Sequence, residues 1–370
     1  MKDVSKRWCV PVAILLCLPV FAYAQQIGPG PGAAQSAPSP NDPVLTHRPA
    51  KPAKVGPPEG RIKLDVVVTD AKGMPVSGLA QQGFTVLDDK QPRQIVSFYA
   101  FDGNAQKADP PVEVILLLDA INLSFQEVSI TRQQVEKFLR QNGGHLAQPV
   151  SIFVATDQTL LSQRQPSNDG NALAARLHEL GPIGQSPGMR ALDVRFNLSI
   201  KMLMAIASAE MNEPGRKLLV WLGPGWPTMG GVQFSQASER VKEQDFSAIV
   251  ALSTRLREAH IALYSISDGQ PGEYAYAFQE FLKGVKSARE ADSGDLSLKV
   301  LATESGGQVL LASNDLADQI GRCLQDAGAF YTLTFDPPHT DSPDEYHDLK
   351  VLIKKPGLTA RTSSGYYDQP

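Results

Sequence analysis

The chain has 370 residues, of which 42% are hydrophobic and 20% are charged, and its formal net charge at neutral pH is −4. This composition is ordinary for a soluble globular protein, and the length is sufficient for one large domain and one small one. The sequence contains no basic stripe, which argues against nucleic acid as a partner.

Residues 1–24 have the pattern of a secretory signal. Lys2, Lys6 and Arg7 form a charged start, residues 9–20 are mostly apolar, and residues 22–24 (Ala-Tyr-Ala) have the small-x-small form of a cleavage site. The alternative is a membrane anchor, but the apolar run is short for a span and two prolines interrupt it. We therefore expect a secreted or periplasmic protein with no transmembrane segment after signal cleavage.

Residues 25–60 are expected to be a disordered linker, because they are rich in Pro, Gly, Ala, Ser and Gln and poor in large apolar residues. The next segment, 61–110, changes to strand-like patterns. Strands are expected at 62–68, 84–87 and 94–99, with a tight turn at 88–90.

The C-terminal segment, residues 330–368, reads as three further strands. They are expected at 330–335, 346–354 and 358–367. A small antiparallel unit is only marginally stable alone. We therefore predict that the strands of 61–110 and 330–368 form one small β-sandwich that brackets the middle of the chain.

The middle segment, residues 111–329, alternates strands with helices. Its central feature is the run from Val112 to Asp119, continuously apolar apart from Glu113, which predicts a strand buried on both faces of a mostly parallel sheet. Further strands are expected at 150–156, 217–222, 261–266 and 308–312, with a hairpin arm at 159–163. Helices are expected at 124–141, 171–180, 191–211, 244–260, 296–304 and 315–328. This order predicts a doubly wound α/β domain of the Rossmann-like class, which binds ligands at the carboxyl ends of its strands.

Three features together resemble a von Willebrand factor type A domain: the apolar strand ending in Asp119, the capped helix after it, and the Gly-rich turn that follows residues 217–222. The flanking segments 66–70 (Val-Val-Val-Thr-Asp), 73–79 (Gly-Met-Pro-Val-Ser-Gly-Leu) and 355–361 (Lys-Pro-Gly-Leu-Thr-Ala-Arg) resemble the secreted VWFA-related proteins of acidobacteria. The resemblance implies an extracytoplasmic protein-interaction or adhesion-type module whose partner is another protein or an envelope component.

The resemblance also implies a divalent cation held by oxygen ligands from three loops, and Asp119 matches the first ligand. The two serine positions of that loop hold Ile121 and Leu123, which offer no oxygen. Asn122 and Ser124 lie one residue later and would substitute as ligands if the loop bulges. The alternative is that Asn122 makes a turn and Ser124 caps the following helix.

The other two loops are also incomplete. The second lacks its threonine, with Ser186 as the nearest hydroxyl, and the third has Pro224 where a carboxylate is expected. We therefore predict a degenerate metal-dependent adhesion site that needs no cofactor, with Mg²⁺ or another divalent cation as the only candidate. The crevice is expected to act as a metal-free contact surface that includes Ser186, Gly225 and Trp226. Trp226 is either an exposed anchor on its rim or packed beneath the loop.

Competing functions have less support in the sequence. A structural component of envelope assembly is the main alternative, and a hydrolase or nucleotide-dependent enzyme is the weaker one. No Gly-x-x-x-x-Gly-Lys or Gly-x-Ser-x-Gly motif occurs, and the six histidines are scattered. The aromatic residues of segment 270–295 either bind a partner or cover the end of the sheet. Cys323, the one cysteine outside the signal, is expected to be a buried apolar residue.

Overall fold

The structure is a computed structural model. It describes residues 60–103, 112–163, 165–183, 191–228, 231–267, 273–311, 315–338 and 345–367. The predicted signal, and all of the predicted linker except Gly60, lie outside these residues. Within the described part of the chain, no helix combines the length and the apolar character needed to cross a membrane.

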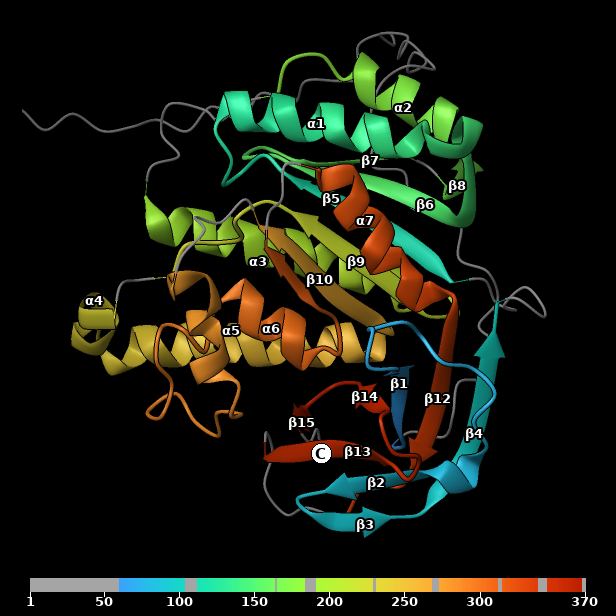
Figure 1. The fold of residues 1–370 in the computed structure, drawn as a ribbon. Coiled ribbons are helices and arrows are strands. Elements are labelled where there is room, and N and C mark those ends of the chain that lie inside the picture. Colours follow the sequence, from blue (N-terminus) through green and yellow to red (C-terminus); the bar gives the residue numbers. More distant parts are fainter. Residues whose placement is uncertain are drawn as a thin grey trace, which may run out of the picture. The chain divides into compact units, whose positions relative to one another are not determined.

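A seven-stranded, mostly parallel sheet is covered by helices on both faces (Figure 1). From one edge to the other its strands are β11 (Val309–Leu311), β10 (Ile261–Ser267), β9 (Lys217–Leu222), β5 (Glu113–Asp119), β6 (His145–Ala155) and β7 (Leu160–Ser162), with β8 (Ser167–Asp169) also paired to β6. Neighbouring strands from β11 to β6 run parallel, whereas β7 and β8 are antiparallel to β6. Every residue of β5 is buried, as predicted for the central strand. The doubly wound α/β class is therefore confirmed.

The helices fall into two groups, each packed on one apolar face of this sheet. One face carries α1 (Phe125–Leu139), α2 (Gly170–Glu179) and α7 (Leu316–Leu324). The other carries α3 (Leu192–Glu210), α5 (Glu239–Glu258) and α6 (Leu298–Glu304). Short 3-10 helices occupy Gln81–Gly83, Gln141–Gly144, Glu273–Phe281 and Gln325–Ala327.

The helices differ from the sequence prediction most clearly at α4 and α5. The short helix α4 (Gly231–Gln236) was not expected. Helix α5 begins before the predicted residue 244, because the Ser238 side chain accepts a hydrogen bond from the Val241 amide and caps it there. Helix α7 begins one residue after the predicted 315, because the Asp315 side chain accepts from the Asp318 amide and caps it.

Two four-stranded antiparallel sheets each combine N-terminal and C-terminal strands, as predicted. The first contains β14 (Thr359–Arg361), β1 (Ile62–Thr69), β12 (Ala329–Phe335) and β4 (Ile95–Asp102). The second contains β15 (Gly365–Tyr367), β13 (Tyr346–Ile353), β2 (Phe84–Asp88) and β3 (Gln91–Arg93). Side chains from both sheets, among them Val66, Val86 and Tyr331, share one apolar core.

A buried ion pair ties the C-terminal strand β14 to the parallel sheet. The Arg361 guanidinium lies 2.5 Å from the Asp326 carboxylate, which also accepts a hydrogen bond from the Tyr264 hydroxyl of β10 at 2.7 Å. Arg361 further donates to the Gly306 carbonyl oxygen at 2.7 Å. Because the Asp326 side chain is only 3% exposed, removal of the arginine would leave an uncompensated charge inside the protein.

Candidate functional site at the carboxyl end of β5

Asp119 is the last residue of the central strand and is completely buried. The strand ends there because the Asp119 side chain accepts from the amides of Ile121 and Asn122, which turns the chain toward α1. The carboxylate therefore lies at the edge of the sheet where folds of this class bind ligands.

Nitrogen donors surround the Asp119 carboxylate. One oxygen, Oδ1, accepts from the amides of Ile121 at 3.2 Å and Asn122 at 3.0 Å. The other, Oδ2, accepts from the indole Nε1 of Trp221, on the neighbouring strand β9, at 3.0 Å. The Asn122 side-chain Nδ2 lies 3.0 Å from each carboxylate oxygen and also donates to the Ser199 hydroxyl of α3. These N–H groups point at the oxygens that a bound cation would need.

Burial raises the pKa of Asp119 to about 6, from an ordinary value of 3.8. Loss of hydration disfavours the ionised carboxylate, and this is the largest effect. The hydrogen bonds from Asn122, Trp221 and Ile121 act in the opposite direction, because they stabilise the negative charge. The N–H donors thus offset part of the free energy that burial of the ionised carboxylate costs. In a site built from oxygen ligands, a bound metal ion has that role.

The loop after β9 closes over this carboxylate at Gly223. Its φ is +151°, and a Cβ there would lie 2.8 Å from the Asp119 Cβ. At Gly225, where φ is +83°, a Cβ would lie 2.7 Å from the Leu298 side chain of α6. Both positions therefore need glycine, and the predicted contact residue Gly225 is packed against α6.

The predicted metal ligands occupy different roles. Ser124 is the N-cap of α1: its hydroxyl accepts from the Glu127 amide at 3.3 Å, and the Glu127 carboxylate accepts from the Ser124 amide at 2.7 Å. Asn122 lies against Asp119 but presents N–H groups to it. The structure thus brings Asp119 and Asn122 together in a hydrogen-bonded turn and uses Ser124 as a helix cap, which are the roles of the non-metal alternative.

Of the two alternatives left open for Trp226, the structure has the buried one. Trp226 is only 4% exposed. Its indole nitrogen donates to the Leu296 carbonyl oxygen at 2.8 Å. Its ring packs in a T-shaped arrangement with the ring of Trp221, with 5.6 Å between the two ring centroids. An indole of this size is stabilised more by packing beneath the loop than by lying on a wet rim. The third predicted contact residue, Ser186, lies outside the described residues.

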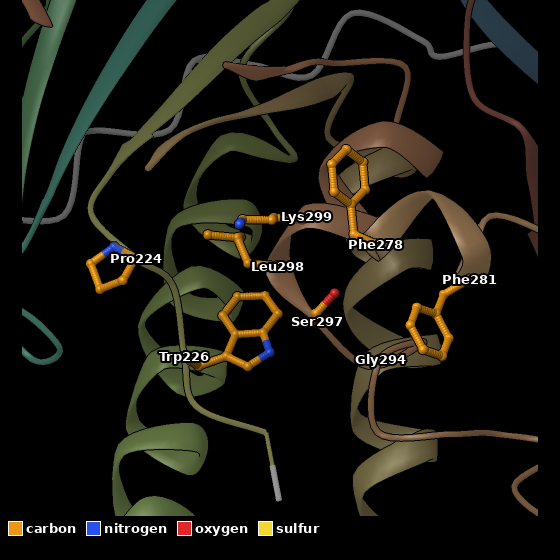
Figure 2. A pocket seen from close by; sticks show the side chains of 8 residues that line it. All are labelled: Pro224, Trp226, Phe278, Phe281, Gly294, Ser297, Leu298 and Lys299. Atoms are coloured by element: carbon orange, nitrogen blue, oxygen red, sulfur yellow. The ribbon is translucent and has the colours of Figure 1, made fainter. Parts of the chain in front are cut away.

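Two cavities flank the loop that carries Trp226. The first, about 230 Å³ in volume, is lined mainly by apolar groups, including Pro224, Trp226, Phe278 and Phe281 (Figure 2). Phe278 and Phe281 belong to the aromatic segment 270–295 and are half-buried. Both rings line a hollow beside Leu298 of α6.

The second cavity, about 220 Å³, lies between the first turn of α3 and the N-terminal half of α5, and we call it the α3–α5 cavity. Phe196, Phe234 and Leu296 line it and are buried, whereas Leu192 and Val241 are 39% and 38% exposed. Asp193 and Asp245 also line it. No pattern in the sequence predicts this cavity, because it depends on how α3 and α5, which are distant in the sequence, pack on the sheet.

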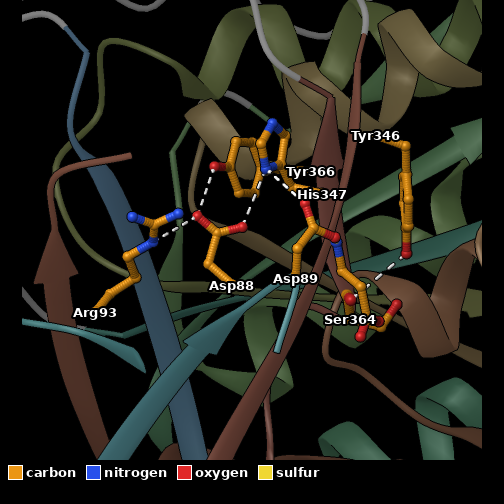
Figure 3. A network of polar contacts seen from close by, with 8 residues as sticks. Asp88, Asp89, Arg93, Tyr346, His347, Ser364 and Tyr366 are labelled. Carbon is orange, nitrogen blue, oxygen red and sulfur yellow. Dashed lines mark hydrogen bonds and ion pairs between the residues drawn. The ribbon is translucent and has the colours of Figure 1, made fainter. Parts of the chain in front are cut away.

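A second group of ligand-type side chains lies in the β-sandwich (Figure 3). The Nδ1 atom of His347 is 3.0 Å from a carboxylate oxygen of Asp88 and 3.1 Å from one of Asp89. These three residues are of the types and spacing that can hold a metal ion. However, Asp88 is already neutralised by Arg93 at 3.1 Å and accepts from the Tyr366 hydroxyl at 3.3 Å. This arrangement serves as a buried polar contact between β2, β3, β13 and β15.

No family model matches the chain, and no curated protein sequence matches it. Among solved structures, the human COPII-coat protein Sec24c is similar with a TM-score of 0.36 and 10% identity, over 81% of this chain and 48% of that one. The manganese-loaded Plasmodium vivax TRAP protein has a TM-score of 0.33 and 12% identity, over 72% and 96%. The SpRpn10 VWA domain has a TM-score of 0.30 and 14% identity, over 57% and 93%.

This chain thus spans about half of the Sec24c chain. At these identities and TM-scores the three likenesses carry no argument about function. The α/β class rests on the strand order described above.

Proposed function

We propose that this chain is a non-catalytic, extracytoplasmic protein-interaction module that contacts another protein or an envelope component through the carboxyl edge of its central sheet. The observation that carries the proposal is the α3–α5 cavity. It lies near the edge where α/β folds bind ligands, and it has exposed Leu192 and Val241 on its rim. A mainly apolar hollow with exposed apolar side chains and polar residues beside it is typical of contact surfaces.

The second part of the proposal is that contact does not depend on a cation at Asp119. The nitrogen donors around its carboxylate support this, because a cation could bind there only after displacing the Trp221 and Asn122 N–H groups. Calorimetric titration of the purified chain with Mg²⁺, Mn²⁺ and Ca²⁺ tests it. We expect no cation to bind at Asp119 with micromolar affinity. Micromolar binding that Asp119→Ala abolishes would overturn this part of the proposal.

The β-sandwich requires a control in that titration. Because Asp88, Asp89 and His347 can hold a metal by type and spacing, heat that survives Asp119→Ala but disappears in His347→Ala belongs to the sandwich. The two variants therefore assign any observed binding to one place in the fold.

Crosslinking pull-down from the native envelope tests the contact surface. Leu192→Glu and Val241→Glu place a charge on the rim of the cavity and are expected to lose the crosslinked partner. Leu352→Glu is the matched control, because this leucine is 41% exposed and belongs to β13 of the sandwich. Equal capture by all three variants would refute the assignment of the surface.

Localisation has its own test. If residues 1–24 are a signal, the mature chain begins at Gln25, and N-terminal sequencing of the protein from the periplasm or culture medium will show it. The main alternative, a permanent component of envelope assembly, predicts that the chain stays with the envelope fraction in high salt. A hydrolase or nucleotide-dependent enzyme is less favoured, since Pro224 has no amide to offer a phosphate.

A further inference from the structure

The α3–α5 cavity carries two carboxylates, Asp193 at the start of α3 and Asp245 on α5. Neither carboxylate forms an ion pair with a cationic side chain in the described part of the chain. The pKa of Asp245 is raised, first because the carboxyl is partly buried and then because the negative charge of Asp193 lies nearby. The cavity therefore presents negative charge that the described residues leave uncompensated.

The volume of the cavity limits its occupant. Pockets that enclose a whole small-molecule ligand are about 300 to 1,000 Å³, whereas this cavity is about 220 Å³. It also opens beside exposed apolar side chains at Leu192 and Val241. A single side chain, carried by a segment that continues over the rim, fits these dimensions better than a free metabolite.

The lining of the cavity selects among basic side chains. Asn197, Gln244 and the two aspartates, whose side-chain oxygens are hydrogen-bond acceptors, line the cavity together with the aromatic residues Phe196 and Phe234. A guanidinium group is planar, carries five donors and packs well on aromatic rings, whereas an ammonium is a compact and strongly hydrated charge.

We propose that the α3–α5 cavity binds an arginine side chain of a partner protein, between Asp193 and Asp245, with apolar residues next to that arginine packed on Leu192 and Val241. This inference rests on the proposed function and names the chemistry of the partner.

A phage-displayed library of random peptides, selected on the purified chain, tests the proposal. We expect the enriched peptides to carry an arginine beside an apolar residue. The affinity of the most enriched peptide is then measured by fluorescence anisotropy, together with its citrulline analogue, which keeps the shape of arginine but has no charge. We expect the analogue to bind at least about tenfold more weakly, as for loss of a partly buried charge pair.

Variants of the chain make the test specific. Asp193→Asn and Asp245→Asn are each expected to weaken the arginine peptide about tenfold, a change of about 1.4 kcal/mol. Glu243→Gln is the matched control, because it removes one negative charge from an exposed position of α5, the helix that carries Asp245. It should leave the affinity for the peptide unchanged. Thermal unfolding of all three variants checks that each one folds.

Three results would overturn the proposal: no enrichment of arginine, equal binding of the citrulline analogue, or affinity that both aspartate variants retain. The proposed function can survive this failure. If Leu192→Glu loses the crosslinked partner while the Asp193→Asn, Asp245→Asn double variant keeps it, the surface is correct and arginine recognition is wrong.

Discussion

Replacing Asp119 by asparagine is expected to remove a pH dependence of stability that arises at this one site. Burial raises the folded-state pKa of Asp119 from 3.8 to about 6. Between pH 3.8 and about 6, Asp119 is therefore protonated in the folded chain and ionised in the unfolded chain. The contribution of the site to stability is complete below pH 3.8 and is lost as the pH rises through 6. The difference of about two pKa units corresponds to about 3 kcal/mol.

The variant has no charge at this position at any of these pH values. Its amide oxygen can accept from the Ile121 and Asn122 amides, as Oδ1 does in the wild type. Its NH₂ group would face the Trp221 indole N–H, which loses its acceptor at a cost of about 1 to 3 kcal/mol. The wild type should therefore be the more stable protein at pH 4, and its advantage should shrink by about 2.4 kcal/mol by pH 7, because part of the effect is already lost at pH 4.

Urea unfolding followed by circular dichroism at pH 4, 5, 6 and 7 measures this difference. Burial also raises the pKa of Glu304 to about 7, but that group is present in both proteins and cancels in the comparison. Glu243→Gln, on the exposed surface of α5, controls for the removal of one negative charge. A difference between wild type and Asp119→Asn that stays constant within about 1 kcal/mol over this range would refute the reasoning, given the usual error of extrapolation.

Three further predictions concern packing and charge. Gly223→Ala should lower the free energy of unfolding by at least about 2 kcal/mol, because the backbone there is strained for alanine and the added Cβ meets the Asp119 side chain. Gly321→Ala, in open space on α7, should instead raise the free energy of unfolding by up to about 1 kcal/mol. Urea unfolding measures both changes. Arg361→Met should lower the free energy of unfolding by about 3 to 5 kcal/mol, because it removes the partner of a buried carboxylate. Lys137→Met, which removes one partner of an exposed pair, should lower it by at most about 1 kcal/mol. Comparable melting temperatures of the two variants would contradict this. Burial raises the pKa of the Cys323 thiol, so a thiol reagent should label it in urea and not in the native chain, and rapid native labelling would show that it is exposed.

Local patterns predicted much of the candidate site. The buried strand ending in Asp119 and the capping box at Ser124 and Glu127 are both present. These features depend on residues close together in the chain, where the burial period and the cap geometry are set by local spacing.

The surroundings of Asp119 depend on residues far apart in the sequence. Trp221 reaches its carboxylate across 102 residues, and Ser199 reaches Asn122 across 77. The absence of serine from positions 121 and 123 predicted the loss of a cation ligand set, but nothing in the local pattern showed that an indole and an amide supply donors in its place. Only the pairing of β5 with β9 places them there.

Trp226 shows the same limit. Its exposure could not be decided from the Gly-rich turn that precedes it, because a tryptophan after such a turn can point outward or inward. Inward packing is favoured here by the Leu296 carbonyl oxygen and the face of Trp221.

The sequence by itself determined the alternation of the main strands and helices, the central place of β5 and the end of that strand at Asp119, because apolar periodicity and helix caps act over a few neighbouring residues. Only the tertiary structure decided what faces the carboxylate, how the Asp88 and His347 side chains meet across 259 residues, and where a cavity opens between α3 and α5. Those features follow from side chains brought together by packing, and packing is a property of the whole core.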